Sequence, residues 1–422
     1  MKNIVITECH DVLNITENGG VNTLSQSEAD ELANFIRNEN IKREYISWDN
    51  KSITFINYVG YIQCSTFSIE ILPKVAIHND FIQQRNVLIE MLNESGYINV
   101  TTTSLAQLQL VNGSLLEIFG RIYASSLSSE LSKGVTMKYL QIEKNLTTLK
   151  GALVISDHIK ENLSRNKKYM AYCEYEEKII DHELNQIFIA ANRVLLKYIN
   201  NLETQKLLKQ IDHVLDGVRY KLFSKIELSR IKLDRTNKRF ALPLLLAKQF
   251  LMNITSSFSA NKETSFSFLF EMNDLFEKYI ASLVKKLTEY TVFEQHNKYR
   301  LLVKENNNRD IFQLKPDVVI DNGEAQIIID TKWKSLTKGN RSGVKREDLF
   351  QMYAYLTRYE RAQTAILLYP KQLGIGFDED IQHESWYLHV DEQKKLKVYS
   401  LSLENKWKTT EELKNILQIN GY

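Results

Sequence analysis

The sequence contains few of the residues that cross-link or punctuate a chain. Among its 422 residues there are three cysteines, four prolines and fifteen glycines. The cysteines, Cys9, Cys64 and Cys173, are an odd number at wide spacing. This excludes a disulfide framework and a zinc ribbon, and it favours a reducing compartment. With so little proline and glycine, domain boundaries have to be inferred from changes in hydrophobic periodicity.

Long hydrophobic runs and an excess of charge are also missing. The longest apolar run, from Phe240 to Ala247, has eight residues, whereas a membrane-spanning helix needs about 20. The first residues, Met1–Ile6, lack the apolar core of a signal peptide. Fifty-four Lys and Arg against fifty-two Asp and Glu give a net charge of +2, so any nucleic-acid site must be a local patch. We therefore expect a cytoplasmic protein that does not bind membranes.

Several catalytic motifs are absent from the sequence. There is no Gly-x-x-x-x-Gly-Lys-Ser/Thr loop, so the chain should not bind a nucleotide in the P-loop manner. There is no Gly-x-Ser-x-Gly elbow, which leaves serine-hydrolase chemistry without support. His182-Glu183 is followed by Gln186 rather than by a second histidine, and the eight histidines are dispersed, so a zinc site is not expected.

The composition, 43% hydrophobic and 25% charged, is that of a globular chain with two or three cored domains. Residues 1–140 are expected to form a mixed domain with a β-rich centre, because Arg43–Val75 alternates apolar and polar residues. A Ser-x-x-Glu capping box precedes a helix predicted at Ser25–Asn38. Residues 141–258 are expected to be helical, since apolar residues recur at helical spacing over Glu176–Leu215 and Phe240–Phe258.

Residues 259–422 alternate helix and strand patterns, which predicts an α/β core. The expected elements are a helix, two strands joined by an Asn-Gly turn, a second helix and an apolar strand, at Phe266–Leu287, Phe312–Ile320, Gln326–Trp333, Glu347–Tyr359 and Thr364–Tyr369. Asn-Gly between two strand patterns is a strong hairpin signal. The fold class expected for the whole chain is therefore multi-domain α/β.

Two acidic residues and a lysine are expected to converge in this hairpin. The two-residue period places Asp317 on the less apolar face of its strand, and it places Asp330, Lys332 and Lys334 on one face of the next strand. Neighbouring strands lie about 4.8 Å apart, so Asp317 and Asp330 could reach one metal ion. Carboxylate oxygens, helped by the backbone carbonyl of Thr331, suit Mg²⁺ or Mn²⁺ better than zinc.

Such a site predicts metal-assisted attack on a phosphodiester. The ion would polarise the phosphate and lower the pKa of water, while Lys332 would orient that water or neutralise the developing charge. The spacing of Pro316-Asp317 and Asp330-Thr331-Lys332 resembles the PD-(D/E)xK nuclease motif. The alternative is a surface Asp and a strand-end Asp-Thr-Lys without catalysis.

Two further features fit that motif. The preceding helix carries Glu277 on the edge of its apolar stripe, where these nucleases often place an acidic residue facing the metal, with Glu271 as the alternative. The following helix carries Gln351 and Tyr355 four positions apart, which matches the Gln-x-x-x-Tyr element that supports the site in one branch of these nucleases.

Longer stretches resemble the McrC family, the nuclease subunit of McrBC modification-dependent restriction systems. The most specific are Phe268–Glu277, Lys315–Asp317, Ile329–Lys334 and Asp348–Tyr355. Weaker matches lie upstream, at Gly60–Ile62, Ile69–Lys74, Leu149–Gly151, Cys173–Tyr175 and Asp181–Asn185. The resemblance covers most of the chain, but it does not extend to Lys221–Arg239 or to the residues beyond about Leu373.

The resemblance implies a DNA endonuclease with a PD-(D/E)xK core that cuts double-stranded DNA. It further implies a McrB-like AAA+ GTPase partner, with the N-terminal domain docking on the partner's ring and stimulating GTP hydrolysis. GTP would act only through that partner. The catalytic residues expected are Asp317, Asp330, Lys332 and Glu277, with Mg²⁺ or Mn²⁺ as the cofactor.

Two basic segments are candidates for contact with DNA. Lys221–Arg239 has seven basic residues against two acidic ones, and it is either a solvated helix face or a DNA-backbone patch. The loop beside the expected site carries Lys338, Arg341, Lys345 and Arg346, which either contact the DNA backbone or are simply solvated.

Two other functions remain open from the sequence. The chain could be a non-catalytic activator and scaffold of a AAA+ GTPase ring, against which the intact Asp317, Asp330 and Lys332 count. It could also be a stand-alone repair nuclease, against which the upstream McrC-like segments count.

Overall fold

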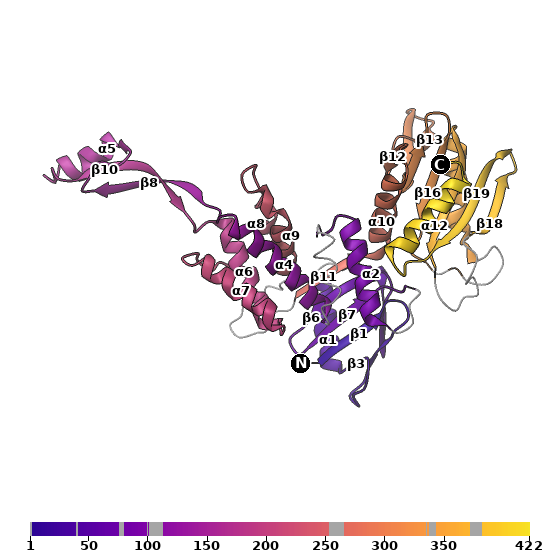
Figure 1. Ribbon diagram of the computed structural model, residues 1–422, viewed down its shortest axis with the longest axis horizontal. Coiled ribbons are helices and arrows are strands. Elements are labelled where there is room, and N and C mark those ends of the chain that lie inside the picture. The colour runs from indigo at the N-terminus through magenta and orange to yellow at the C-terminus, as the bar shows by residue number, and fades with distance from the viewer. Residues whose placement is uncertain are drawn as a thin grey trace. The chain divides into compact units, whose positions relative to one another are not determined.

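The computed structural model describes residues 2–38, 41–75, 80–98, 100, 113–252, 266–334, 336, 343–371 and 382–422. Its contacts divide the chain into two compact units, one made of Met1–Leu115 with Thr255–Tyr422 and the other of Leu116–Ile254. Both contain helices and strands, so the chain is a multi-domain α/β protein (Figure 1). The three consecutive regions expected from the sequence, with limits at residues 140 and 258, stay a prediction. No described helix has the length and hydrophobicity needed to cross a membrane.

The N-terminal part of the first unit is β-rich, as expected. Its described strands form two four-stranded sheets. The first sheet has the strand order β1 (Lys2–Thr7), β7 (Phe67–Leu72), β6 (Tyr58–Gln63) and β11 (Phe266–Glu271). The second sheet has the strand order β3 (Thr23–Leu24), β2 (Leu13–Ile15), β5 (Ser52–Phe55) and β4 (Ile46–Asp49). The other elements among the described residues of this part are α1 (Gln26–Asn38), a 3₁₀ turn at Arg43–Tyr45 and α2 (Phe81–Glu94).

The predicted capping box at the start of α1 is confirmed. The backbone N–H of Ser25 donates to the Glu28 carboxylate over 2.9 Å, and the backbone N–H of Glu28 donates to the Ser25 hydroxyl over 3.2 Å. Two N–H groups that the helix leaves unpaired are thereby satisfied. The apolar face of α1, with Leu32, Phe35 and Ile36, then packs into the core of the sheets.

The helix predicted from Phe266 is wrong over its first six residues. Phe266–Glu271 is the strand β11, which pairs antiparallel with β6, and the helix α10 is confined to Met272–Leu287. A strand follows here because β6 offers an open edge, and pairing with it satisfies the backbone of both segments. Gly60 permits the close approach, since a Cβ at its φ of +133° would lie 2.0 Å from the carbonyl oxygen of Phe268. The chain's last third therefore begins as a strand of the N-terminal sheet.

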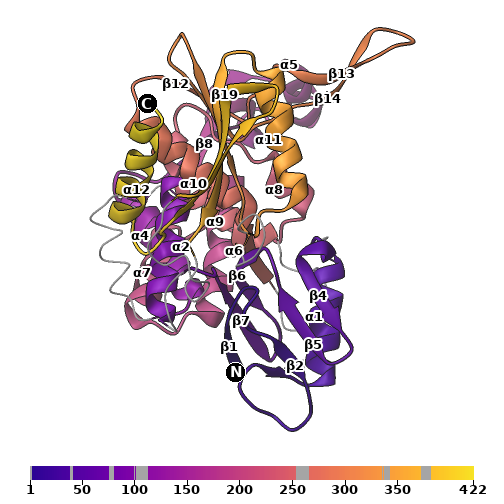
Figure 2. The ribbon, with the colours of Figure 1, turned by 90° about the vertical axis from the view of Figure 1, so that its right-hand side faces the viewer.

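The C-terminal part of the same unit is built on a mixed sheet with helices on both faces. Its described strands number six, in the order β12 (Thr291–Glu294), β15 (Val318–Asp321), β16 (Gln326–Thr331), β17 (Ala362–Pro370), β19 (Asp391–Leu401) and β18 (Gln382–Leu388). β16, β17 and β19 run parallel. α11 (Arg346–Arg358) covers one face, and α10 and α12 (Lys406–Ile419) cover the other (Figure 2). A separate ribbon consists of β13 (Arg300–Lys304) and β14 (Arg309–Gln313).

The hairpin predicted around Asn322-Gly323 is confirmed, but its first strand is shorter than expected. β15 pairs antiparallel with β16 from Val318 to Asp321. Phe312 instead belongs to β14, and it has a φ of 59°, in the left-handed region. Pro316 has no N–H to donate to a ladder, so the strand cannot continue from one ribbon into the other. The helix and strand predicted after the hairpin are confirmed as α11 and β17.

The second unit contains the expected helices and also a sheet that the sequence did not reveal. The helices are α4 (Leu115–Ser132), α6 (Glu183–Tyr198), α7 (Leu202–Val214), α8 (Lys225–Arg230) and α9 (Ala241–Met252), with a 3₁₀ turn at Lys238–Phe240. The described sheet has the order β8 (Lys138–Leu146), β10 (Ala171–Ile179) and β9 (Ala152–Leu153). α5 (Ile155–His158) and a π-helical turn at Ile159–Leu163 lie at its far end (Figure 1).

The expectation that residues 141–258 are helical is thus wrong where β8, β9 and β10 lie. The helical pattern predicted from Glu176 begins only at Glu183, because Glu176 and its neighbours pair with β8. Pairing over nine positions outweighs the local helical spacing of the apolar residues.

Candidate functional site

The candidate site lies where β16 ends. β16 is buried along its whole length, because α10 packs against it and its Ile328 shares a core cluster with Met352 and Leu356 of α11. Val318 pairs with Ile329, so Asp317 and Asp330, the next residues on the two strands, lie opposite each other. Asp330 is 1% exposed, and Asp317 is half-buried. The structure therefore brings together the two carboxylates that the sequence placed across the hairpin.

Asp317 is fixed by the residue that follows Asp330. One of its carboxylate oxygens accepts hydrogen bonds from the backbone N–H of Thr331 over 2.7 Å and from the Thr331 hydroxyl over 2.8 Å. Burial, followed by the charge of Glu277, raises the pKa of Asp317, although the Thr331 hydrogen bonds oppose that rise. Asp317 is thus held in place but is costly to ionise without a cation nearby.

Asp330 forms an ion pair with Lys332, two residues along the chain. Burial and the neighbouring Asp317 raise the pKa of Asp330, and the Lys332 ammonium lowers it in part. Burial works against the charged form of Lys332, but Asp330 and the other nearby carboxylates raise its pKa above the ordinary value. At neutral pH the site therefore holds one firm positive charge among carboxylates that repel one another.

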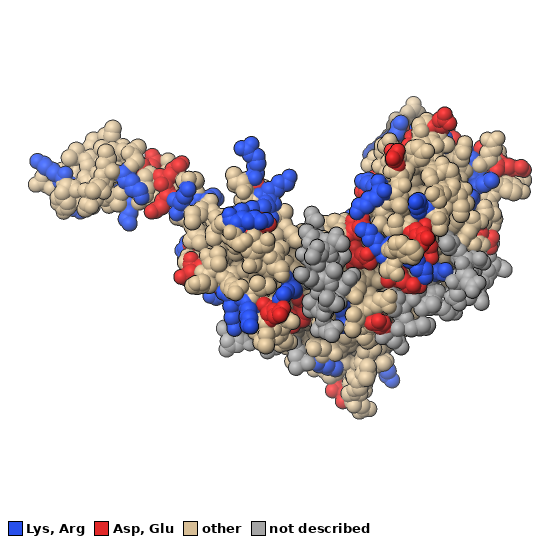
Figure 3. Space-filling view, in the orientation of Figure 1, with Lys and Arg blue, Asp and Glu red and all other residues tan. Residues whose placement is uncertain are grey.

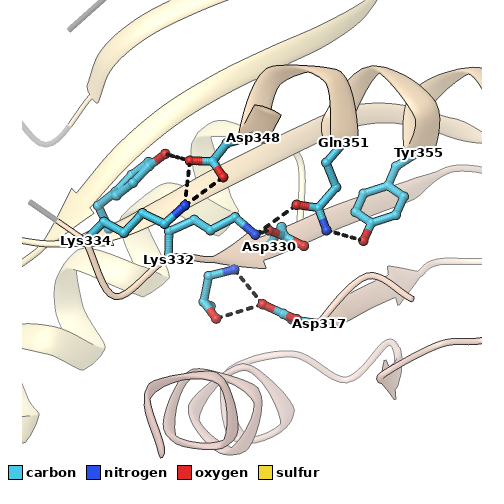
Figure 4. Close-up of polar contacts among 9 residues, drawn as sticks. Asp317, Asp330, Lys332, Lys334, Asp348, Gln351 and Tyr355 are labelled. Carbon is cyan, nitrogen blue, oxygen red and sulfur yellow. Dashed lines mark hydrogen bonds and ion pairs between the residues drawn. The ribbon is translucent and has the colours of Figure 1, made fainter. Parts of the chain in front are cut away.

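Of the supporting residues predicted on α11, Gln351 contacts this lysine and Tyr355 contacts Gln351 (Figure 4). The Lys332 ammonium donates to Oε1 of Gln351 over 2.9 Å, and the Gln351 amide donates to the Tyr355 hydroxyl over 2.8 Å. Burial raises the pKa of Tyr355, so its phenol stays protonated at neutral pH. The four-residue spacing puts Gln351 and Tyr355 on one face of the helix, from which they hold the Lys332 side chain toward Asp330.

Glu277 rather than Glu271 lies near the carboxylates. The charge of Glu277 raises the pKa of Asp317, and burial, with a smaller contribution from Asp330, raises the pKa of Glu277 itself. Gln295 ties the two together, since its side chain donates to Glu277 over 2.8 Å and its backbone N–H donates to the carbonyl of Asp317 over 2.8 Å. Gln295 has a φ of 44°, a strained backbone for a residue with a side chain. Glu271 instead forms an ion pair with Lys42.

Sequence reasoning missed Gln295 and a fourth acidic residue of the site, which lies on α11. Asp348 is 4% exposed and pairs with Lys334 over 3.1 Å, and it accepts a hydrogen bond from the Tyr369 hydroxyl over 3.3 Å. Its charge also acts on Asp330 and Lys332. The signal for Asp348 was its place one turn before Gln351 on the same helix, whereas Gln295 lies in a stretch without any recognisable pattern.

The basic residues expected beside the site are described only in part. Lys338 and Arg341 lie outside the described residues. Lys345 and Arg346 are exposed at the start of α11, the helix that also carries Gln351. In the other basic segment, Lys221 pairs with Glu227, and Arg239 donates to the carbonyl of Gly134. Figure 3 shows basic side chains gathered over the part of the second unit that includes α8.

The donor set of the site is entirely oxygen. Asp317 lies just before β15, Asp330 and Thr331 end β16, and Glu277 on α10 is close enough for its charge to act on Asp317. Among the described residues no cluster of three or more His, Cys, Asp or Glu side chains is already arranged as a metal cage. Two facing carboxylates with raised pKa values nevertheless fit a hard divalent cation completed by water and substrate oxygens.

The fold and the site define a class of protein: a multi-domain α/β chain with buried carboxylates and a lysine gathered at the end of a mixed sheet. A family model described as the McrBC 5-methylcytosine restriction system component matches residues 53–370. The chain therefore belongs to this McrBC family, as its motifs indicated. A search of curated proteins found no match.

Two solved structures share the fold. A half-complex from a tetradecameric assembly of Thermococcus gammatolerans McrB AAA+ hexamers with bound McrC contains a chain with a TM-score of 0.77 and 20% identity, covering 99% of this chain and 100% of that chain. The Thermococcus gammatolerans McrBC complex contains one with a TM-score of 0.56 and 24% identity, covering 69% of this chain and 89% of that chain. The first likeness shows a common fold over nearly the full length of the chain, and the second over about two thirds of it.

Proposed function

We propose that this chain is the nuclease subunit of a McrBC-type restriction system, cutting double-stranded DNA at a Mg²⁺- or Mn²⁺-dependent PD-(D/E)xK site. The observation that carries the proposal is the convergence of Asp317, Asp330 and Lys332 at the buried end of β16. A scaffold without catalysis has no use for two facing carboxylates whose mutual repulsion the Lys332 ammonium offsets only in part.

Asp317, Asp330 and the Thr331 carbonyl would hold the ion, with Glu277 acting directly or through a water. When bound, the ion supplies Lewis-acid stabilisation of the phosphate and a water of lowered pKa. The hydrogen bonds from Thr331 fix Asp317 before the ion binds, so little reorganisation is needed.

Lys332 would act on the reacting phosphate group. It is already held by Asp330 on one side and Gln351 on the other, so its ammonium points along the edge of the site. From there it can donate to the attacking water, or to a phosphate oxygen as negative charge develops. Because its pKa is raised, Lys332 serves as an orienting cation rather than as a general base.

The partner proposed for this chain is a McrB-like AAA+ GTPase, whose GTP hydrolysis the chain stimulates. The support is the family and the fold shared with McrC bound to McrB AAA+ hexamers. The absence of a P-loop from the sequence agrees with this division of labour, since GTP would bind only to the partner. The N-terminal docking predicted from the sequence stays part of the proposal.

The arm formed by β8, β10 and α5 offers the same partner a further surface. Large apolar side chains are exposed along it, among them Tyr139, Leu149, Ile155 and Tyr169 at 58%, 68%, 67% and 72%. Such a series on one small sheet with its connecting segments and α5 is typical of a protein-binding surface. Replacing Leu149 and Ile155 by Asp should reduce GTPase stimulation while DNA cleavage chemistry and thermal unfolding of the free chain stay unchanged.

The decisive experiment changes Asp330 to Ala and measures two activities on one preparation with the partner present. Linear DNA cleavage is followed on gels, and GTP hydrolysis is followed by phosphate release. Asp330→Ala should slow cleavage by roughly a hundredfold or more, since the ion it holds supplies several kcal/mol of transition-state stabilisation. GTPase stimulation should persist.

Asp321→Asn is the matched control. Asp321 is a carboxylate of the same hairpin, but it lies at the turn and pairs with Arg361. Its loss should leave cleavage within about twofold of the unmodified chain, as expected for a partly exposed ion pair. If Asp330→Ala cuts DNA as fast as the unmodified chain, the nuclease proposal fails and the activator and scaffold function replaces it.

A further inference from the structure

The residue after the candidate catalytic lysine contacts the N-terminal part of the chain. Trp333 follows Lys332, and its side chain lies on the opposite face from Lys332 and Lys334, which contact α11. Its indole N–H donates to Oε1 of Glu8 over 2.6 Å. Glu8 follows the last residue of β1 and is 0% exposed. A single hydrogen bond thus joins positions 325 residues apart.

Trp333 is enclosed from two sides. Lys74 lies just after β7. Its ammonium is 3.4 Å from the carbonyl oxygen of Trp333 and 5.7 Å from the centre of the Trp333 ring. On the other side its ring lies 5.3 Å from that of Phe276, the residue before Glu277 on α10. Trp333 is therefore wedged between the ends of β1 and β7 and the helix that carries Glu277.

The N-terminal part also fixes the start of that helix. Asn57, between β5 and β6, accepts the backbone N–H of Met272 on its carbonyl over 2.9 Å and that of Asn273 on its side chain over 3.0 Å. Both N–H groups lie in the first turn of α10, where the helix itself supplies no acceptor for them. The same sheet therefore contacts both the strand end that carries Lys332 and the helix that carries Glu277.

The burial of Glu8 in this position lowers the free energy of unfolding. Burial raises its pKa to about 8, against which the nearby Lys74 and the Trp333 hydrogen bond act only in part. Within the described part of the chain, its Oε2 has no hydrogen-bond partner. An apolar residue would fill the position with less loss of stability, so the carboxylate is explained by the group it holds.

We infer that Glu8 is a positioning residue of the nuclease site, which fixes Trp333 and thereby the adjacent Lys332 and the helix that carries Glu277. The N-terminal part then supports the nuclease site through Glu8 at the end of β1, in addition to being a candidate docking domain. This inference rests on the proposed nuclease function, because its effect is measured on DNA cleavage.

The test compares Glu8→Ala, Glu8→Gln, Trp333→Phe and the Glu8→Ala/Trp333→Phe double variant in the full chain with its AAA+ partner. A misplacement of about 1 Å can cost about a hundredfold in rate, so Glu8→Ala and Trp333→Phe are each expected to lower kcat for linear DNA by about tenfold or more. KM for DNA should change by less than about twofold, because the loss concerns the reacting groups rather than binding.

Two readouts separate positioning from general destabilisation. Glu8→Gln keeps an oxygen that can accept the indole N–H, so it should restore kcat to within about threefold. The double variant should be no slower than the slower single variant, since both changes break one contact. Glu70→Gln is the matched control, because Glu70 is 2% exposed in the same sheet but pairs with Arg85. It should lower the unfolding temperature and leave kcat unchanged.

A folded Glu8→Ala chain with unchanged kcat would overturn the inference, as would an equal loss in Glu70→Gln. If Glu8→Ala does not fold, Trp333→Phe and Glu8→Gln decide the question, and an unchanged kcat in Trp333→Phe overturns the inference. Failure of the proposed function would look different: the unmodified complex would not cut DNA with Mg²⁺, or Asp330→Ala would cut it normally.

Discussion

Thr331 donates two hydrogen bonds to a single oxygen of Asp317, one from its backbone N–H and one from its hydroxyl. These bonds tie the end of β16 to the residue before β15, so Asp317 and Asp330 are held opposite each other without a ligand. Their mutual repulsion is retained in the fold, and the cation proposed for this site would relieve it. Preorganisation of this kind places the cost of arranging the site in folding rather than in the reaction.

Metal dependence follows from the oxygen donors. DNA cleavage by the complex should require Mg²⁺ or Mn²⁺, whereas Ca²⁺ should bind and support little turnover, because it accepts looser geometry and more ligands. The measurement is the initial cleavage rate after chelation and addition of each ion alone. Full activity in excess chelator, or recovery with zinc only, would contradict the assignment.

Glu277 and Glu271 provide a paired test of the acidic residue on the preceding segment. Glu277→Ala should lower the cleavage rate by about tenfold or more, because it removes a charge that acts directly on Asp317. Glu271→Ala breaks an ion pair with the exposed Lys42 and should leave the rate within about twofold. Equal losses in the two variants would show that Glu277 has no special place in the site.

The missing P-loop leads to a prediction about the chain on its own. Purified without its partner, it should hydrolyse neither GTP nor ATP, and it should stimulate GTP hydrolysis when the AAA+ protein is added. Phosphate release, measured with each protein alone and with the two mixed, checks both statements. Robust hydrolysis by the isolated chain would rule out the two-subunit function.

Glu8 predicts the direction in which stability depends on pH. Its pKa is raised from 4.5 to about 8, so between those values the folded chain binds a proton that the unfolded chain has released. The free energy of unfolding should therefore fall as pH rises through this window, by up to about 1.4 kcal/mol per pH unit from this group. Glu8→Gln should remove that contribution. The free energy of unfolding, measured with denaturant at about pH 6 and about pH 8, checks this. A pH profile identical to that of the unmodified chain would contradict the prediction.

Much of the candidate site could be predicted from the sequence because its chemistry depends on local spacing. Asp330 and Lys332 share a face of one strand, and Gln351 and Tyr355 share a face of one helix, so two-residue and four-residue periods were sufficient. The capping box of α1 and the Asn-Gly hairpin are local in the same way. A buried parallel strand such as β17 was found because its apolar residues form a continuous run.

Other features depended on partners distant in the chain. Phe266–Glu271 is a strand because β6 offers an open edge, and Glu176 is in a strand because β8 lies beside it. Neither partner can be read from the periodicity of the segment itself, and the helical spacing of its apolar residues predicted the wrong element.

The sequence by itself determined the chemical groups of this protein and the faces of the strands and helices that carry them. Only the tertiary structure decided which groups meet: Gln295 with Glu277, Asp348 with Lys334, and Glu8 with Trp333. The physical reason is that a buried carboxylate or indole N–H must find a partner wherever the packed chain supplies one, and that partner is set by sheet pairing and helix packing rather than by separation along the chain.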